Sequence, residues 1–286
     1  MIAFDYLASP GQLGNQMFKY AALKGIAKNN QYEYIVPPSY LWLEKNQFMY
    51  KVFKKLKNYN YQNHFLFNYF ELETLNKKQI KFSNFEREIS PKHIGFDEEL
   101  YNSCPDNIQL KGFFQSPKYF KNIEEVLRKD FKFKRKFINL ANNILPKLND
   151  PISLHIRRGD YVTHPNHFSL DLNYYKNAID YFGKDNEYFV FTDDPEWFQN
   201  QDFYSPENFK LISKITKNST VLDLYIMSLC KKHIIANSTF SWWGAWLSNS
   251  RAVIYPLRWY KDKNKSSKDL PLEYWTGIEN NIKELK

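Results

Sequence analysis

The sequence predicts an α/β protein that is built on parallel sheets and divided into two domains. Its 286 residues are about twice the length at which a single hydrophobic core is most common, so two domains are favoured. The chain opens with a strand, a glycine turn and a helix, and from Pro151 onward short apolar strands alternate with helical segments. Strands that alternate with helices form parallel sheets with right-handed crossovers.

The first domain is expected to cover residues 1–150. In chain order we expect a strand with Ile2, Phe4 and Tyr6, a turn over 11–15, a helix with Phe18, Ala21, Ala22 and Ile26 on its apolar face, and strands over 32–36 and 108–114. Ser116 and Pro117 then begin a helix, because proline at the first helical position loses no hydrogen bond. Residues 39–105 give no assignable pattern.

The second domain is expected to cover residues 151–286, where the alternation becomes regular. In order we expect strands over 152–157, 187–192, 209–212, 233–236 and 252–255, with helices over 173–182, after Pro195, over 220–231 and over 240–247. The polar clusters of this half follow the carboxyl ends of these strands. Ligands bind at that edge of a parallel sheet, so we expect the functional residues to gather there.

The composition bounds the class of protein. Hydrophobic residues make up 43% and aromatic residues 18% of the chain, which argues against disorder. The two cysteines, Cys104 and Cys230, are far apart and predict neither a disulfide scaffold nor a zinc site. The beginning has no basic segment or apolar run typical of a secretory signal, and the uncharged stretch 234–250 is interrupted by polar residues. We therefore expect a cytoplasmic protein.

The net charge of +9 suits nucleic acid, an anionic membrane surface or a phosphorylated substrate. A drift towards lysine in an AT-rich genome explains the charge equally well. Residues 44–57 form a basic amphipathic pattern that would suit a peripheral contact with the inner membrane, although an ordinary packed helix has the same pattern.

An arginine pair marks the end of the strand 152–157. The run from His155 to Tyr161 contains Arg157, Arg158 and Asp160. A guanidinium group matches the geometry of phosphate oxygens, so this pair could neutralise a diphosphate. A salt bridge between the domains is the alternative.

Three other runs deserve an interpretation. The Gly11–Gln16 turn would let the backbone approach a ligand at a helix N-terminus. An ordinary tight turn without a ligand has the same sequence pattern. The Asp193-Asp194 pair suits a metal or, with Pro195, a helix cap, and the cap is favoured. The Asn237–Trp243 run could receive a phosphate at the start of a helix. Asp223 lies among apolar residues and needs a hydrogen-bonding partner, which could be a guanine base, a lysine or a helix cap.

Four blocks together resemble the bacterial α-1,2-fucosyltransferases of glycosyltransferase family 11. They are Gly11–Phe18, His155–Tyr161, Phe191–Pro195 and Asn237–Trp243, in the order that the family shows. The resemblance reaches from residue 11 to about residue 247. It implies a GT-B architecture with two Rossmann-like domains facing a cleft, the acceptor on the N-terminal side, GDP-β-L-fucose in the C-terminal half, and no metal or other cofactor.

The resemblance also implies roles for individual residues. His155 and Asp223 look like guanine contacts, Arg157 and Arg158 like diphosphate contacts, Ser238, Thr239 and Phe240 like the floor under phosphate and sugar, and Gly11, Gly14, Asn15 and Gln16 like the cleft and acceptor side. Val162–Pro165 stand where the related α-1,6 enzymes carry a candidate base. Asp160, or less favourably His155, is left for that role.

These observations predict inverting, metal-independent transfer of L-fucose to the 2-hydroxyl of a terminal β-galactoside. Arg157 and Arg158 would stabilise the departing GDP, and Asp160 would serve as a late base. Another GDP-sugar glycosyltransferase and a non-catalytic RNA-binding protein are the competing interpretations; the predicted partners are GDP-fucose and a glycan acceptor rather than nucleic acid.

Overall fold

The computed structural model describes residues 1–5, 7, 11–36, 66–72, 85–145, 149–262 and 264–280. It divides into two compact units, Met1–Lys134 and Arg135–Lys286. The division falls before helix α6 (Arg135–Ile144) and not near residue 150, because α6 packs against α10 (Thr220–Leu229) in the second unit. The basic segment 44–57 lies outside the described residues.

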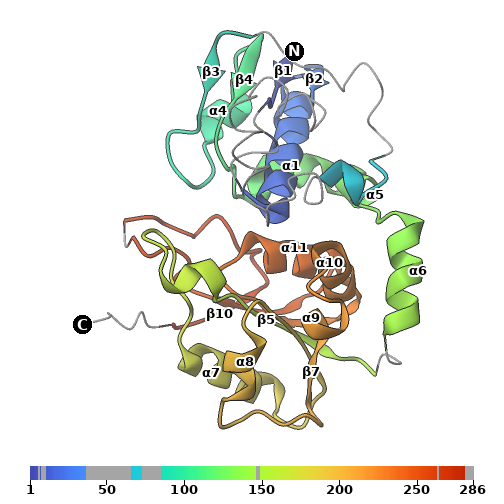
Figure 1. The fold of residues 1–286 in the computed structure, drawn as a ribbon. Helices are drawn as coiled ribbons and strands as arrows, with labels where there is room; N and C mark the ends of the chain where they lie inside the picture. The colour runs from blue at the N-terminus through green and yellow to red at the C-terminus, as the bar shows by residue number, and fades with distance from the viewer. Residues whose placement is uncertain are drawn as a thin grey trace, which may run out of the picture. The chain divides into compact units, whose positions relative to one another are not determined.

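The first unit contains a four-stranded parallel sheet in the order β2-β1-β4-β3 (Figure 1). Its strands are β1 (Ile2–Ala3), β2 (Tyr34–Ile35), β3 (Glu88–Ile89) and β4 (Ile108–Leu110). Its helical elements are α1 (Leu13–Asn29), η2 (Leu66–Asn68), α4 (Glu98–Asn102), η3 (Pro117–Ile123) and α5 (Glu124–Asp130).

Helix α1 is buried along most of its length and packs against η3. A Cβ atom on Gly25 would lie 1.9 Å from the carbonyl oxygen of Tyr119, so this contact requires a glycine. Ser116 caps η3 by accepting a hydrogen bond from the backbone N–H of Lys118, and Pro117 occupies the first turn. The helix start predicted from Ser116 and Pro117 is therefore confirmed.

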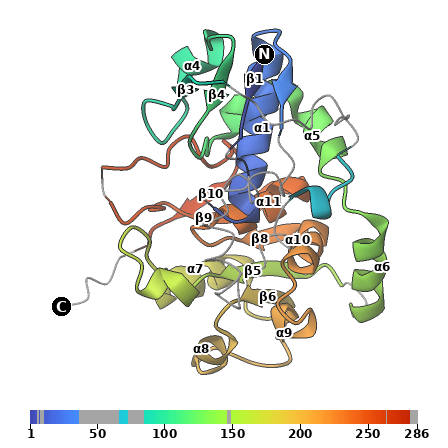
Figure 2. The same cartoon turned by 45° about the horizontal axis from the view of Figure 1, so that its top comes forward.

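The second unit contains a six-stranded parallel sheet in the order β10-β9-β8-β5-β6-β7, which the labels of Figure 2 follow from β10 to β6. Its strands are β5 (Ile152–Ile156), β6 (Tyr188–Thr192), β7 (Phe209–Leu211), β8 (Lys232–Ile234), β9 (Ala252–Pro256) and β10 (Thr276–Ile278). All of their pairings are parallel. The parallel sheet predicted for this half is confirmed.

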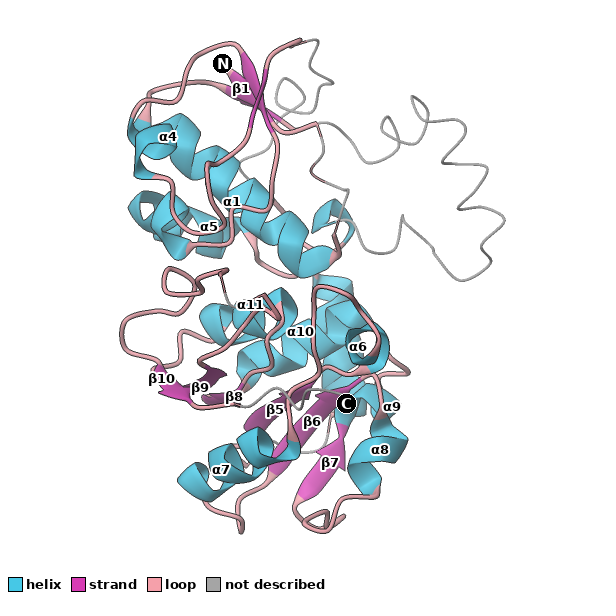
Figure 3. Ribbon diagram, turned by 90° about the vertical axis from the view of Figure 1, so that its left-hand side faces the viewer, coloured by secondary structure: helices cyan, strands magenta, loops and turns pink. Residues whose placement is uncertain are grey.

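Helices cover both faces of this sheet. Helix α7 (Leu172–Phe182) lies on one face, while α10 and α11 (Thr239–Leu247) lie on the other (Figure 3). Trp242, Trp243 and Trp246 of α11 are each at most 1% exposed and form the aromatic core beneath that helix. The remaining helical elements are η4 (Gly159–Val162), α8 (Pro195–Gln199) and α9 (Ile212–Ile215). No helix among the described residues has the length and apolarity needed to cross a membrane.

Candidate functional site

The second sheet has a point where its strand order reverses. Strand β5 pairs with β6, the next strand along the chain, on one side and with β8 on the other. A crevice forms beyond the carboxyl ends of the two strands at such a reversal, and ligands bind there. The chain passes from β5 directly into Arg157, and from β8 through two residues into Asn237. The topology therefore brings the predicted blocks to one edge.

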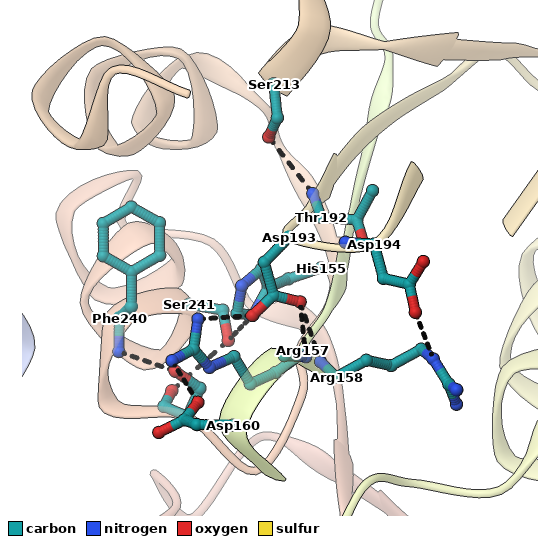
Figure 4. A network of polar contacts seen from close by, with 12 residues as sticks. His155, Arg157, Arg158, Asp160, Thr192, Asp193, Asp194, Ser213, Phe240 and Ser241 are labelled. Carbon is teal, nitrogen blue, oxygen red and sulfur yellow. Dashed lines mark hydrogen bonds and ion pairs between the residues drawn. The ribbon is translucent and has the colours of Figure 1, made fainter. Parts of the chain in front are cut away.

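Arg157 is held by two carboxylates. Its Nη1 atom donates to Asp193 Oδ2 at 2.5 Å, and its Nη2 atom donates to Asp160 Oδ1 at 2.6 Å (Figure 4). The guanidinium also lies 5.3 Å from the centre of the Tyr161 ring. The Asp160 side chain is 56% exposed and that of Asp193 only 27%. The ion pair of Arg157 with Asp160 is therefore the more accessible of the two to solvent or to an incoming anion that competes for the guanidinium.

Asp193 holds the loop after β5 as well as the arginine. Its Oδ1 atom accepts hydrogen bonds from the backbone N–H groups of Arg158, at 2.9 Å, and Gly159, at 3.2 Å. A Cβ atom on Gly159 would lie 2.6 Å from Asp193 Oδ2, so a larger residue would push this carboxylate away. Ile156 and Thr192 are partners in the ladder between β5 and β6, which places Arg157 and Asp193 at the same level.

Arg158 points away from Arg157 (Figure 4). Its Nε atom donates to Asp194 Oδ2 at 3.0 Å, and its guanidinium lies 4.0 Å from the ring centre of Trp197. Asp194 also caps α8 by accepting from the backbone N–H of Trp197, which confirms the capping interpretation. All ion pairs given for the two arginines are made within the second unit, and the alternative of an inter-domain salt bridge stays a prediction.

His155 connects β5 to α11. Its Nδ1 atom lies 2.8 Å from Ser241 Oγ, and its ring contacts the Phe240 ring at a centre distance of 5.7 Å. Burial lowers the pKa of His155 to about 3, and Arg157 adds to this effect. The imidazole is therefore neutral near pH 7, which suits a hydrogen bond to a base and makes His155 a weak proton acceptor.

The first turn of α11 faces the same edge. Ser238 caps the helix by accepting from the backbone N–H of Phe240 at 3.3 Å, and Thr239 and Phe240 are half-buried. The Asn237 side chain donates to the carbonyl oxygens of Phe168, at 3.0 Å, and Trp259, at 3.2 Å. Asn237 is 1% exposed, and its Oδ1 atom has no hydrogen-bond partner in the described part of the chain.

Asp223 lies on α10 and is 7% exposed. Its two oxygens accept hydrogen bonds from the hydroxyl groups of Ser213, at 2.7 Å, and Thr216, at 2.5 Å. Burial raises the pKa of Asp223 to about 6, against the opposing effect of these two hydroxyls. The hydrogen-bonding partners expected for the Asp223 carboxylate are thus two hydroxyl groups. Each carboxylate oxygen keeps further acceptor capacity, and the role of Asp223 at guanine stays a prediction.

The predicted acceptor-side residues lie in the first unit, at the start of α1. Gly11 has φ 109°, which a glycine adopts without strain. Gln16 is 2% exposed and accepts a hydrogen bond from the backbone N–H of Leu66, while Asn15 accepts one from Gln115. Gly14 is buried. Gln16 therefore has a structural role within its own unit, and contact of this turn with an acceptor stays a prediction.

The sequence interpretation missed the contribution of Asp193. It was assigned only to a cap or a metal, because its partners come from another strand and their meeting depends on strand order. Gly159, between Arg158 and Asp160, was the signal that a side chain from elsewhere approaches this backbone. Within the described ranges, no group of three or more His, Cys, Asp or Glu side chains is placed to hold a metal ion.

Comparison with known proteins gives consistent matches along nearly the whole chain. Residues 6–279 match the model of the family described as Glycosyl transferase family 11. The chain is 28% identical over 308 residues to the O-antigen biosynthesis glycosyltransferase WbnK of Escherichia coli, covering 96% of this chain and 100% of that protein. It is 33% identical over 305 residues to an Escherichia coli alpha-1,2-colitosyltransferase, covering 94% and 97%.

A solved structure confirms the fold class. The fucosyltransferase NodZ from Bradyrhizobium matches with a TM-score of 0.51 at 13% identity, covering 85% of this chain and 91% of that one. Together with the two parallel sheets, this likeness confirms the predicted GT-B class.

Proposed function

This chain belongs to glycosyl transferase family 11, and we propose that it transfers L-fucose from GDP-β-L-fucose to the 2-hydroxyl of a terminal β-galactoside, with inversion. The observation that carries the proposal is the position of Arg157. It follows β5 at the strand reversal, and His155, next but one to it in the chain, contacts the first turn of α11. A diphosphate bound to that helix start would meet the guanidinium.

Arg157 would act on the leaving group. As the bond from the sugar to the diphosphate breaks, negative charge grows on the departing oxygen and positive charge grows on the sugar. A fixed guanidinium stabilises that negative charge without reorganisation during the step. Asp193 accepts a hydrogen bond from one nitrogen of Arg157, so the arginine would already be oriented when the donor arrives.

Asp160 would change partners when the donor binds. It is the more exposed of the two carboxylates on Arg157, so an incoming diphosphate displaces it more readily than Asp193. Once released, Asp160 would accept the proton of the attacking hydroxyl late in the reaction. His155 is the less favourable base because burial lowers its pKa to about 3, so its neutral imidazole takes up a proton only weakly near pH 7.

The guanine base would be recognised by neutral and acidic groups on both sides of the crevice. His155 offers a ring nitrogen other than the one that contacts Ser241, and Asp223 offers carboxylate oxygens to the N–H donors of guanine. We propose that no metal takes part, because the guanidinium of Arg157 supplies the positive charge that a metal would otherwise bring to the diphosphate.

A second donor is favoured by one comparison. The 33% identity to an alpha-1,2-colitosyltransferase makes colitose the alternative sugar. Colitose lacks a hydroxyl that fucose carries at C3, and a site that hydrogen-bonds this hydroxyl would reject colitose strongly. Competition between the two GDP-sugars for one acceptor therefore measures which donor the site is built for.

The test is a transfer assay with the full chain in EDTA. GDP-fucose, GDP-colitose and GDP-mannose are each offered with a panel of β-galactosides, and the product linkage is determined by NMR. We expect an α-1,2-linked fucosyl product. Transfer of colitose alone would replace the donor, and a product linked elsewhere than at the 2-hydroxyl would refute the linkage.

A further inference from the structure

A cavity lies in the second unit, beyond the carboxyl end of β9. Its volume is about 730 Å³, and its walls come mostly from the connection between β9 and β10. Its lining includes Arg258, Trp259, Tyr260, Lys265, Ser266 and Lys268. None of the roles proposed above for the nucleotide sugar uses these residues. A cavity of this size accommodates a ligand of roughly disaccharide to trisaccharide dimensions.

Hydrogen bonds connect this cavity to the candidate active site. Asn237, which follows β8 at the strand reversal, donates to the carbonyl oxygens of both Trp259 and Phe168. The Arg258 guanidinium lies 5.9 Å from the centre of the Phe168 ring. Phe168 belongs to the loop that begins with Arg157. The cavity wall and that loop are thus fixed to one buried side chain.

Two aromatic rings of the same loop stack beside Arg157. Tyr161 faces the Arg157 guanidinium and stacks on His167 with a ring-centre distance of 4.5 Å and an interplanar angle of 7°. Burial lowers the pKa of His167, while His164, Arg157 and Lys265 lower it further and Asp160 opposes them. Lys265 of the cavity lining thus lies within electrostatic range of the His167 ring.

The lining carries more positive than negative charge. Arg258 donates to the carbonyl oxygens of Lys261, at 2.8 Å, and Tyr260, at 3.4 Å, so its contacts are with neutral groups. In the described ranges, neither Arg258 nor either lining lysine forms an ion pair within 4 Å. The carboxylates of the lining are Asp262 and Glu279, which leaves three cations against two anions.

We propose that this cavity is a subsite for the acceptor saccharide, in addition to the acceptor side predicted at Gly11–Gln16, and that it prefers an acceptor carrying an anionic group. Aromatic faces and hydroxyl groups are the surfaces that bind sugar rings, and the unpaired cations supply the preference for charge. Within the second unit, the nucleotide contacts proposed above come from β5, α10 and α11, and none comes from the connection between β9 and β10. The assignment of the bound saccharide as the acceptor rests on the proposed function, whereas the binding of an anionic saccharide does not.

The experiment compares two probes, lactose and lactobionate, which share a β-galactosyl group while only lactobionate carries a carboxylate. Binding to the full chain is measured by saturation-transfer NMR in the presence of GDP. We expect lactobionate to bind at least about fivefold more tightly, the effect of one contact between unit charges in water. The double variant Lys265→Glu, Lys268→Glu should weaken lactobionate at least about tenfold, by two such contacts, and lactose less than about twofold.

Lys231→Glu is the matched control, because Lys231 is exposed and lies just before β8, at the opposite edge of the sheet. It should leave lactobionate binding unchanged, and GDP affinity by calorimetry should be the same in all variants. Equal binding of the two probes, or equal binding by wild type and double variant, would overturn the proposed subsite. Lysine-dependent binding without any sugar transfer would instead refute the proposed function and keep the saccharide site.

Discussion

Arg157 and Arg158 leave β5 as chain neighbours, yet their guanidinium groups enter different surroundings. Arg157 lies between two carboxylates, one of them mostly exposed, beside the start of α11. Arg158 lies on the face of Trp197 and pairs with Asp194, the cap of α8. Successive side chains of an extended segment point to opposite sides, so one sequence motif serves two regions. The arginine with an exchangeable partner is the one suited to a ligand.

The largest expected effect would come from Arg157→Ala. If this guanidinium stabilises the departing diphosphate, kcat/KM should fall by about a hundredfold to a thousandfold, as on losing an oxyanion-hole donor. Arg157→Lys should recover little, because an ammonium cannot bind two oxygens in a fork. Steady-state kinetics on folded protein check this. Near-normal rates in the alanine variants of both arginines would refute the mechanism.

The predicted contact of Asp223 with guanine tests a part of nucleotide binding that involves neither arginine. Asp223→Asn should weaken GDP binding by about 1–3 kcal/mol, because the amide presents a donor to the donors of guanine and leaves buried groups unpaired. Isothermal titration calorimetry measures the change, and circular dichroism shows whether the variant is folded. Unchanged GDP affinity in the folded variant would remove Asp223 from the site.

The pH dependence gives Asp223 a second signature. Burial raises its pKa from 3.8 to about 6, so the folded protein keeps a proton that the unfolded chain loses near pH 4. The associated stabilisation is complete below pH 4 and is lost as the pH rises through 6, by at most about 3 kcal/mol. Guanosine affinity should change in the opposite sense and increase with pH through 6. Denaturation and guanosine titrations of wild type and Asp223→Asn check both, because the variant should show neither trend.

Arg158→Ala should affect stability more than chemistry. The loss of the contact with Trp197 and of the partly exposed pair with Asp194 should lower the free energy of unfolding by about 1–2 kcal/mol. Turnover per folded molecule should stay within about tenfold of wild type, well short of the loss expected at Arg157. Urea unfolding gives the first quantity and active-site-normalised kinetics the second. A large catalytic loss with an unchanged unfolding midpoint would reverse the roles of the two arginines.

The smallest expected effect is that of chelation. If Arg157 supplies the positive charge at the diphosphate, EDTA should leave kcat/KM within about twofold of its original value. The assay is the same transfer reaction before and after dialysis against EDTA. Activity that is lost and then restored by Mn²⁺ or Mg²⁺ would contradict this prediction and assign the charge to a metal.

The sequence predicted the second sheet well because its strands are apolar runs ended by clear polar signals. Strands β5 and β6 are buried at every position, and Asp194 with Pro195 marks the start of α8. Strand β10 has no such signal, since it is three residues long and contains a glycine. Helix α6 was missed because it is rich in asparagine and buries only Ala141.

The candidate site was predicted as a set of residues and not as an arrangement. The strand ends identified His155 and the arginine pair, because polar residues after a buried strand indicate a ligand edge. The meeting of Arg157 with Asp193 depends on which strands pair and in which register, and local sequence carries no record of either. The divergence of Arg158 likewise depends on where α8 places Trp197.

The two hydrogen bonds of Asn237 bear on the motion of the loops around the site. The buried Asn237 amide donates hydrogen bonds to the carbonyl oxygens of both Phe168 and Trp259. Two loops that are far apart in the chain are therefore bonded to the same side chain. Opening either loop breaks a hydrogen bond inside the protein, where no water replaces it at once. We expect the openings of the two loops to be coupled through this side chain, which similar rates of amide hydrogen exchange in the two loops would show. A molecule that orders one loop should then slow the fluctuations of the other.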